Sequence, residues 1–236
     1  MIDFANLPAK DKIYYQDDSV VIYCADCREI LPLFPDKSFN LVLTDPPYGI
    51  DYQSARRTAP FRKEKITGDN EFPMWLFELK PTMAMFVWCR WDILPKMPMP
   101  KSFIVWDKCR HSMGDLNHEY GRQWESIAFY PQDGHQFNYR PIDIIRVPCV
   151  PACDLQHPNE KPEGIVTALL EANKGDVILD PFLGSGTTAV AAKILGRKCV
   201  GIEISEKYCE IAAKRCSQSV MQLEIPKAVI AQDKLC

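Results

Sequence analysis

The sequence predicts an α/β fold in which a mostly parallel sheet carries helices on both faces. Short apolar runs alternate along the chain with longer segments whose apolar residues have helical spacing. Two motifs that could carry chemistry each come directly after one of the short apolar runs. The 236 residues are 47% apolar and 25% charged, which is the composition of an ordinary soluble globular protein with a core of normal size.

The elements are expected in the following chain order. Short runs rich in Val, Ile, Leu and aromatic residues predict strands at 20–24, 39–43, 83–88, 102–106, 125–130, 177–179 and 198–202. Longer amphipathic segments predict helices at 26–34, 75–80, 162–173, 187–195 and 206–217. Segments 52–70 and 131–160 are rich in polar residues and are expected to be irregular, and the tail 219–236 has no assignment.

Composition excludes several classes of protein. No apolar run approaches the roughly 20 residues that span a bilayer, and residues 1–4 lack the basic and apolar regions of a secretory signal. The ten cysteines are scattered, so we expect reduced thiols in a cytoplasmic protein. The close pairs Cys24/Cys27 and Cys149/Cys153 do not have the spacing of a zinc ribbon, and no metal is expected.

The most informative motif is Asp45-Pro46-Pro47-Tyr48, which follows the apolar run 41–44. Proline fixes φ and has no N–H, so this turn presents carbonyl oxygens beside a carboxylate without competing donors. An aromatic ring next to these acceptors suits a planar ligand that carries an amino group. We therefore expect a site for an amine-bearing ring at the end of the strand at 39–43.

The second motif runs from Asp180 to Thr188, between a predicted strand and a predicted helix. Its glycines allow a tight turn and a close approach to a ligand, and Glu203 ends the next strand, where it could accept ribose hydroxyls. Read as Gly184-x-Gly186-x-x-Ala189, the motif could bind a dinucleotide. However, Asp180 would repel a pyrophosphate and suits an ammonium group, which favours S-adenosylmethionine.

Together, Asp45-Pro46-Pro47-Tyr48 and Phe182-x-Gly184-x-Gly186 resemble the motifs of amino-group DNA methyltransferases, and their order resembles the β group. The resemblance covers roughly residues 18–217 and implies a Rossmann-like methyltransferase fold with a mixed, mostly parallel seven-stranded sheet. It also implies a circular permutation, in which the strand at 20–24 lies beside that at 198–202. The cofactor-binding residues that it implies are Asp26, His157, Lys161, Asp180, Phe182, Gly184, Ser185, Gly186, Thr187 and Glu203.

The resemblance also implies a mechanism. Asp45 and the Pro46 carbonyl accept the two N–H groups of the target amine, Tyr48 stacks on the target ring and Pro47 shapes the turn, so catalysis is mainly orientation. The target base is flipped out of the helix. Asp before Pro-Pro is usual for adenine enzymes, so we expect site-specific transfer from S-adenosylmethionine to adenine N6, with S-adenosylhomocysteine as product and restriction-modification as one setting.

DNA is the expected partner, although the net charge of −3 does not indicate a nucleic-acid-binding protein. A basic cluster within 54–66 is a solvated loop in one interpretation, and its position after Tyr48 favours phosphate contacts. The expected DNA-binding residues are Arg56, Arg57, Arg62, Lys63, Lys65 and Arg140. We expect a single methyltransferase domain over 1–236, with a mobile basic loop at about 52–70 and a small target-recognition insertion within about 107–156. A homodimer is plausible by resemblance.

Three other functions stay open at this point. The same fold could modify another acceptor: cytosine N4, an RNA adenine or a protein amide. A nicotinamide-dependent oxidoreductase would use Gly184 and Gly186, but it leaves the Asp-Pro-Pro-Tyr motif unexplained. A catalytically silent relative that binds nucleic acid is disfavoured by the intact Asp45 and Tyr48.

Overall fold

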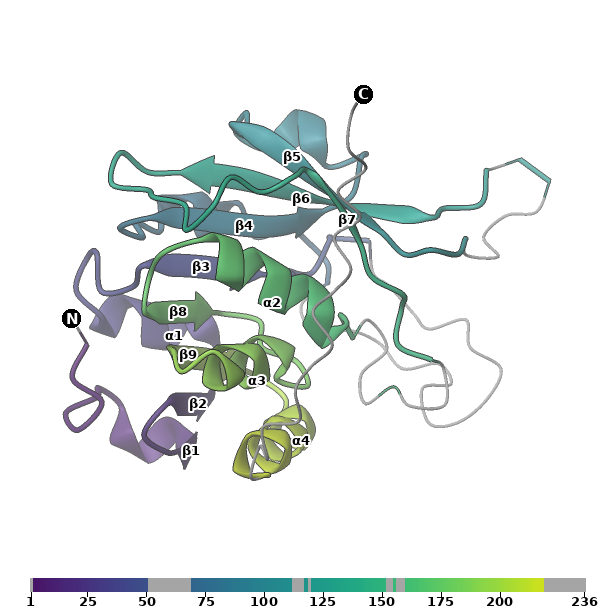
Figure 1. Ribbon diagram of the computed structural model, residues 1–236. Helices are drawn as coiled ribbons and strands as arrows, with labels where there is room; N and C mark the ends of the chain where they lie inside the picture. Colours follow the sequence, from purple (N-terminus) through teal and green to yellow (C-terminus); the bar gives the residue numbers. More distant parts are fainter. Residues whose placement is uncertain are drawn as a thin grey trace.

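The computed structural model describes residues 2–50, 69–111, 117–118, 120–151, 155 and 160–218. These residues form a nine-stranded sheet with the strand order β1-β2-β9-β8-β3-β4-β6-β5-β7 (Figure 1). The strands are β1 (Ile13–Gln16), β2 (Val20–Cys24), β3 (Leu41–Thr44), β4 (Ala84–Cys89), β5 (Ser102–Asp107), β6 (Trp124–Pro131), β7 (Ile144–Arg146), β8 (Val177–Asp180) and β9 (Lys198–Glu203). Strands β2, β9, β8, β3 and β4 are parallel to one another, whereas β6 is antiparallel to β4 and β5.

The α/β class is confirmed, but the expected number of seven strands is wrong. The additional strands, β1 and β7, form the two edges of the sheet. Strand β7 has three residues and lies in a segment that was expected to be irregular. Short edge strands carry little sequence signal because the neighbouring strand supplies their hydrogen bonds.

An N-terminal strand and the last strand of the described chain are neighbours in the sheet. Strand β2 pairs in parallel with β9 over its whole length, from Val20 opposite Cys199 to Cys24 opposite Glu203. Residues far apart in sequence therefore finish side by side at the same edge. The expected adjacency of these two strands is confirmed.

Helices cover both faces of the sheet. Helices α2 (Glu163–Ala172), α3 (Thr187–Ile194) and α4 (Glu206–Ser217) lie on one face, and α1 (Cys27–Ile30) lies on the other (Figure 1). Successive strand residues point to opposite faces, so Val20 and Ile22 join the core under α2 to α4, while Val21 and Tyr23 join the core near α1. Both faces of the central strands are therefore buried.

Helix α1 is shorter than the expected helix at 26–34. It begins after Asp26, whose carboxylate accepts a hydrogen bond from the Arg28 backbone N–H at 2.9 Å. The chain then continues as a 3₁₀ turn over Leu31–Leu33, with a proline near its start. Because proline lacks the N–H that a continuing α-helix needs, the helix ends there. Helices α2, α3 and α4 match their expected bounds to within one residue at each end.

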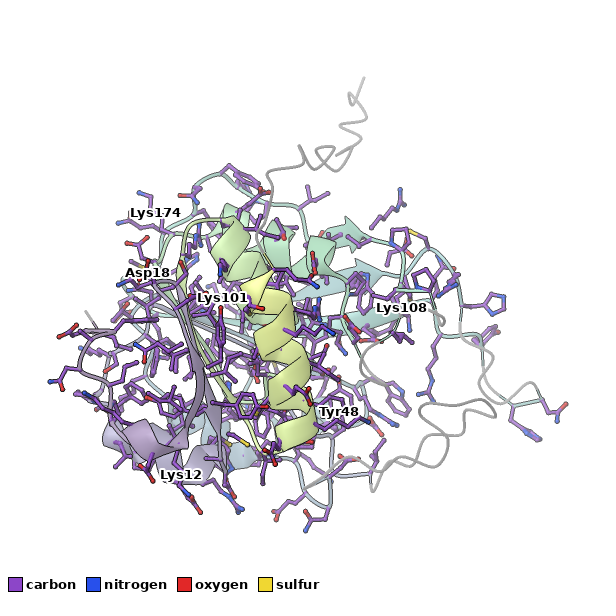
Figure 2. The ribbon with its side chains drawn as sticks, turned by 90° about the horizontal axis from the view of Figure 1, so that it is seen from below. Lys12, Asp18, Tyr48, Lys101, Lys108 and Lys174 are labelled. Carbon is purple, nitrogen blue, oxygen red and sulfur yellow. The ribbon has the colours of Figure 1, made fainter. Side chains whose placement is uncertain are left out.

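The carboxyl ends of the parallel strands share one edge of the sheet. Tyr48 follows β3 and Lys108 follows β5, whereas Lys174 and Asp18 precede β8 and β2. Figure 2 shows Tyr48 and Lys108 toward one end of the molecule and Lys174 and Asp18 toward the opposite end. Because β6 runs in the opposite direction, it begins at the edge where the parallel strands finish. Loops from separate parts of the chain therefore converge there.

Candidate active site

A cavity of about 1190 Å³ opens at the carboxyl edge of the parallel strands. It is large enough for a nucleoside-sized ligand together with a second ring. The predicted site residues that line it are Asp26, Asp45, Pro46, Pro47, Tyr48, Lys161, Asp180, Phe182, Gly184, Ser185, Thr187 and Glu203. Gly186 lies behind this surface, and His157 is outside the described residues. The structure therefore brings both sequence motifs to one cavity.

The glycine loop between β8 and α3 has the strained backbone that glycine allows. Gly184 has φ of 54° and Gly186 has φ of 89°, both in the left-handed region. A Cβ at Gly186 would lie 2.8 Å from the Ala212 Cβ on α4. The turn and its close packing on α4 therefore both require glycine at this position.

Glu203, at the end of β9, holds this loop. One carboxylate oxygen accepts the Gly184 N–H at 2.8 Å, and the other accepts the Ser205 N–H at 2.8 Å. The Ile204 N–H is a further backbone donor to this carboxylate, so these bonds take up most of its roughly four acceptor positions. Acceptance of ribose hydroxyls by Glu203 stays a prediction.

Asp180, at the end of β8, is a buried carboxylate that lacks a cationic partner among the described residues. It accepts the Phe182 N–H at 3.1 Å. Burial raises the pKa of Asp180 to about 7, with a hydrogen bond from Thr188 opposing this and the carboxylates of Asp45 and Glu203 adding to it. A ligand ammonium would favour the ionised form, so this residue fits the amino-acid part of S-adenosylmethionine.

Asp26 lies near Glu203 although the two are far apart in sequence. The Ala25 N–H donates to the Glu203 carbonyl at 3.0 Å, and Asp26 lines the same cavity. The Arg28 guanidinium hydrogen-bonds Asp26 and lowers the pKa of that carboxyl. This arrangement agrees with the prediction that Asp26 and Glu203 lie beside one ligand site.

The catalytic motif shows contacts that the sequence did not predict. The Tyr48 hydroxyl donates a hydrogen bond to Asp45, and the Lys161 ammonium lies 2.7 Å from the other Asp45 oxygen. Burial raises the pKa of Asp45, while Lys161 opposes the increase. Lys161, which was expected beside the cofactor, thus contacts the carboxylate that the sequence predicts to be catalytic. Stacking of Tyr48 on a base stays a prediction.

Glu125 is a site residue that the motif analysis missed. It lies near the start of β6, 3.2 Å from the Lys161 ammonium and 3.4 Å from the Lys108 ammonium. Burial alone would raise the pKa of Glu125, but these two cations outweigh it and lower the pKa. The available signal was a carboxylate at the beginning of an antiparallel strand, which places it at the edge where parallel strands end.

Arg215 on α4 is a second missed residue, and it joins two loops of the site. Its guanidinium donates to the Glu160 carboxylate at 2.9 Å and to the Ser185 carbonyl at 2.9 Å. A third bond reaches Glu163 at 2.9 Å. The loop before α2 and the glycine loop are therefore held together by one partly buried cation.

Aromatic and basic side chains are part of the lining of the cavity. Trp91 and Trp124 line it and are 62% and 50% exposed, whereas Trp88 and Trp106 are buried in the core. The basic residues among its lining are Arg28, Arg90, Arg110, Arg122, Lys108 and Lys161. Exposed indoles at the entrance could stack on bases.

The predicted DNA contacts are mostly untested. Arg56, Arg57, Arg62, Lys63 and Lys65 fall outside the described residues. Arg140 lines a separate cavity of about 170 Å³ near the start of β5, at the opposite edge of the sheet from the large cavity. This location gives Arg140 no place at the entrance, and its contact with DNA stays a prediction.

Two negative observations complete the description. Within the described ranges, no helix combines the length and apolar character needed to cross a membrane. Over the same part of the chain, no three His, Cys, Asp or Glu side chains are grouped as metal ligands would be.

Comparisons with known proteins show similarity to DNA methyltransferases. Residues 151–214 match the family model described as DNA methylase, of the N6/N4 type. The chain is 26% identical to the type II methyltransferase M2.MboI of Moraxella bovis, over 86% of this chain and 90% of that protein. It is 25% identical to the DNA adenine methyltransferase YhdJ of Escherichia coli (strain K12), over 85% of this chain and 84% of that protein.

Solved structures support the same fold. The structure of M1.HpyAVI in complex with SAM matches with a TM-score of 0.62 and 22% identity, covering 83% of this chain and 99% of that one. The PvuII DNA methyltransferase, described as cytosine-N4-specific, matches with a TM-score of 0.66 and 16% identity, covering 86% and 88%. The chain is therefore similar to S-adenosylmethionine-dependent DNA methyltransferases, and these matches support the family that modifies exocyclic amino groups, adenine N6 or cytosine N4.

Proposed function

We propose that this protein transfers a methyl group from S-adenosylmethionine to N6 of a flipped-out adenine at specific sites in DNA. The observation that carries the proposal is the position of Asp45 across one cavity from Asp180 and Glu203. An amine held at the first residue would face a methyl donor held by the other two. The aspartate before Pro46-Pro47, which resembles the adenine enzymes, supports adenine, and so does the name of the similar protein YhdJ.

The chain's own residues orient the acceptor. The lone pair of an exocyclic amine is delocalised into its ring, so the enzyme must localise it. Asp45 accepts one N–H and the Pro46 carbonyl accepts the other, which directs the lone pair out of the ring plane. Tyr48 and Pro47 shape the ring site, and Asp45 receives the proton that the amine loses.

The residues that would hold the methyl donor are assigned from the chemical properties of their side chains. When bound, S-adenosylmethionine supplies a methyl group activated by its sulfonium. Glu203 and Asp26 hold the nucleoside part, and Asp180 with the glycine loop holds the amino-acid part. His157 is assigned to the same site by resemblance alone.

The proposal also covers the DNA partner, the domain organisation and the oligomeric state. DNA is the partner, and the basic residues of 54–66 hold phosphates while the base is out of the helix. The chain acts as one domain in the cytoplasm, with a small recognition region within 107–156, and a homodimer accompanies these expectations by resemblance. A short recognition region supports a short target sequence or help from a second subunit.

The decisive experiment incubates the pure protein with unmethylated genomic DNA and S-adenosylmethionine. The DNA is then digested to nucleosides, and the modified nucleoside is identified by mass spectrometry. We expect N6-methyldeoxyadenosine. The cytosine-N4 alternative, favoured by the likeness to the PvuII enzyme, predicts N4-methyldeoxycytidine instead.

A matched pair of variants tests the role of Asp45. Asp45→Asn should abolish transfer while binding of S-adenosylhomocysteine survives, because the cofactor contacts are made elsewhere. Asp36→Asn serves as the control, since that side chain is 74% exposed and pairs only with Lys80 among the described contacts. Full activity of Asp45→Asn would refute the mechanism.

A further inference from the structure

Four charges of alternating sign form a chain along the lining of the cavity. Lys108 lies 3.4 Å from Glu125, Glu125 lies 3.2 Å from Lys161, and Lys161 lies 2.7 Å from Asp45. The four residues come from segments after β5, within β6, before α2 and after β3. Lys161 and Lys108 are each only 12% exposed at the side chain. Each of the four charges therefore lies beside at least one charge of opposite sign.

Asp45 would be difficult to ionise without this arrangement. It is partly buried, with 22% of its side chain exposed, which disfavours a carboxylate, and Glu125 on β6 and Asp180 on β8 both add negative charge near it. Tyr48, on its own turn, donates a hydrogen bond, and the Cys89 thiol on β4 also faces it. Among the described residues, the cation in direct contact with Asp45 is Lys161.

We propose that Lys161, held in place by Glu125, is a positioning residue that keeps Asp45 ionised and oriented to accept the target amine. This inference rests on the proposed function, in which Asp45 receives an N–H of the base. A neutral carboxylic acid would present a donor at one oxygen and would lose part of its capacity to accept. The ammonium of Lys161 therefore sets the state in which Asp45 can act.

The Lys161 ammonium balances the charge of Asp45 and does not block the target amine from its oxygens. Each oxygen of a carboxylate can accept two hydrogen bonds, and Tyr48 and Lys161 each use one position on different oxygens. Acceptor capacity therefore stays available for the amine. Burial alone would lower the pKa of Lys161, but Asp45 and Glu125 outweigh it and raise the pKa. Lys161 thus stays charged at neutral pH and does not serve as a proton acceptor.

The direct test measures the titration of the Asp45 carboxyl in the protein without cofactor. The protein is labelled with ¹³C at the aspartate carboxyl carbon, and Asp45→Asn identifies the Asp45 resonance. Lys161→Met keeps the length of the side chain and removes its charge, so the Asp45 midpoint should move to higher pH by about one unit or more. Lys161→Arg keeps the charge and should hold the midpoint closer to that of the wild type. An unchanged midpoint in Lys161→Met would overturn the proposal.

A double-mutant cycle tests the part played by Glu125. Removing its negative charge should by itself lower the Asp45 midpoint, and Glu125→Gln should do this in the Lys161→Met background. When Lys161 is present, the same change also releases the ammonium, so the midpoint should rise. A fall in both backgrounds would show that Glu125 does not position Lys161. If Lys161→Met does not fold, Lys161→Gln replaces it throughout.

Methyl-transfer rates provide the functional counterpart. Activity rises with pH as Asp45 ionises, so Lys161→Met should shift the acid limb of the rate profile upward by the amount seen in the titration. Its activity should then recover at high pH. A wild-type protein that transfers no methyl group to DNA would refute the proposed function, whereas the carboxyl titration would still report whether Lys161 controls Asp45.

Discussion

Asp180 gives the most quantitative prediction, because a buried acid without a cation should make the protein less stable as pH rises. The pKa of its carboxyl is about 7 in the folded protein, against an ordinary value of 3.8. Between these values the folded protein binds the proton and the unfolded chain releases it. The free energy of unfolding therefore falls as pH increases through this window, by about 1.4 kcal/mol for each unit.

The expected magnitude follows from the two pKa values. From pH 5 to pH 8, Asp180 alone should remove about 2.5 kcal/mol from the free energy of unfolding, most of it below pH 7. Asp180→Asn cannot ionise and should lose none of this contribution. The difference in stability between Asp180→Asn and the wild type should therefore shift in favour of the variant by about 2.5 kcal/mol between these two pH values.

Urea unfolding of the cofactor-free protein at pH 5 and pH 8 measures this difference. Asp176→Asn is the matched control, because Asp176 precedes the same strand and is exposed. The difference in unfolding free energy between this variant and the wild type should change little between the two pH values. Comparing each variant with the wild type cancels the titration of groups that do not interact with the replaced residue. If Asp180→Asn and the wild type respond identically to pH, Asp180 is ionised in the folded protein and the reasoning fails.

Three further predictions concern the loops of the site. Gly186→Ala should lower the free energy of unfolding by about 1–3 kcal/mol, because φ is 89° and the added Cβ would lie 2.8 Å from a carbon on α4. Gly196→Ala is the control, since Gly196 has φ of 67° but open space around it, and it should lower stability less in thermal melts. Equal losses of stability in the two variants would contradict the steric argument. Arg215→Met leaves Glu160 buried without that cation and should destabilise by about 2–4 kcal/mol, less so when combined with Glu160→Gln; strict additivity would count against the pairing. Glu203→Gln removes one acceptor of the loop's backbone bonds and should weaken S-adenosylhomocysteine binding by about 1–3 kcal/mol, measured by calorimetry, and unchanged affinity would exclude Glu203 from the cofactor site.

The elements that sequence predicted well share a local cause. The parallel strands and helices α2, α3 and α4 have strong apolar runs or helical spacing, and each was placed to within a few residues. Strands β1 and β7 were missed because they are short and depend on pairing with a neighbour. Helix α1 was overextended because the proline within it was given too little weight.

The residues of the candidate site also form two groups, those that the sequence predicted and those that only the folded structure shows. Asp45, Asp180 and Glu203 were found because each ends an apolar run, a position that chain order alone reveals. Glu125 and Arg215 carry no motif, and their importance depends on side chains that are distant in sequence. Arg215 has no local signal of this kind, and the signal of Glu125 is informative only once the direction of β6 is known.

The sequence by itself determined the α/β class, the two motifs and the chemistry that they suit, since strand periodicity and residue type are local properties. The tertiary structure alone decided the contacts of Asp45, because the direction of β6 and the path of the chain before α2 bring Glu125 and Lys161 to it. Charge interactions depend on distance in space rather than along the chain. The ionisation state of the catalytic acid is therefore a property of the folded sheet and not of its motif.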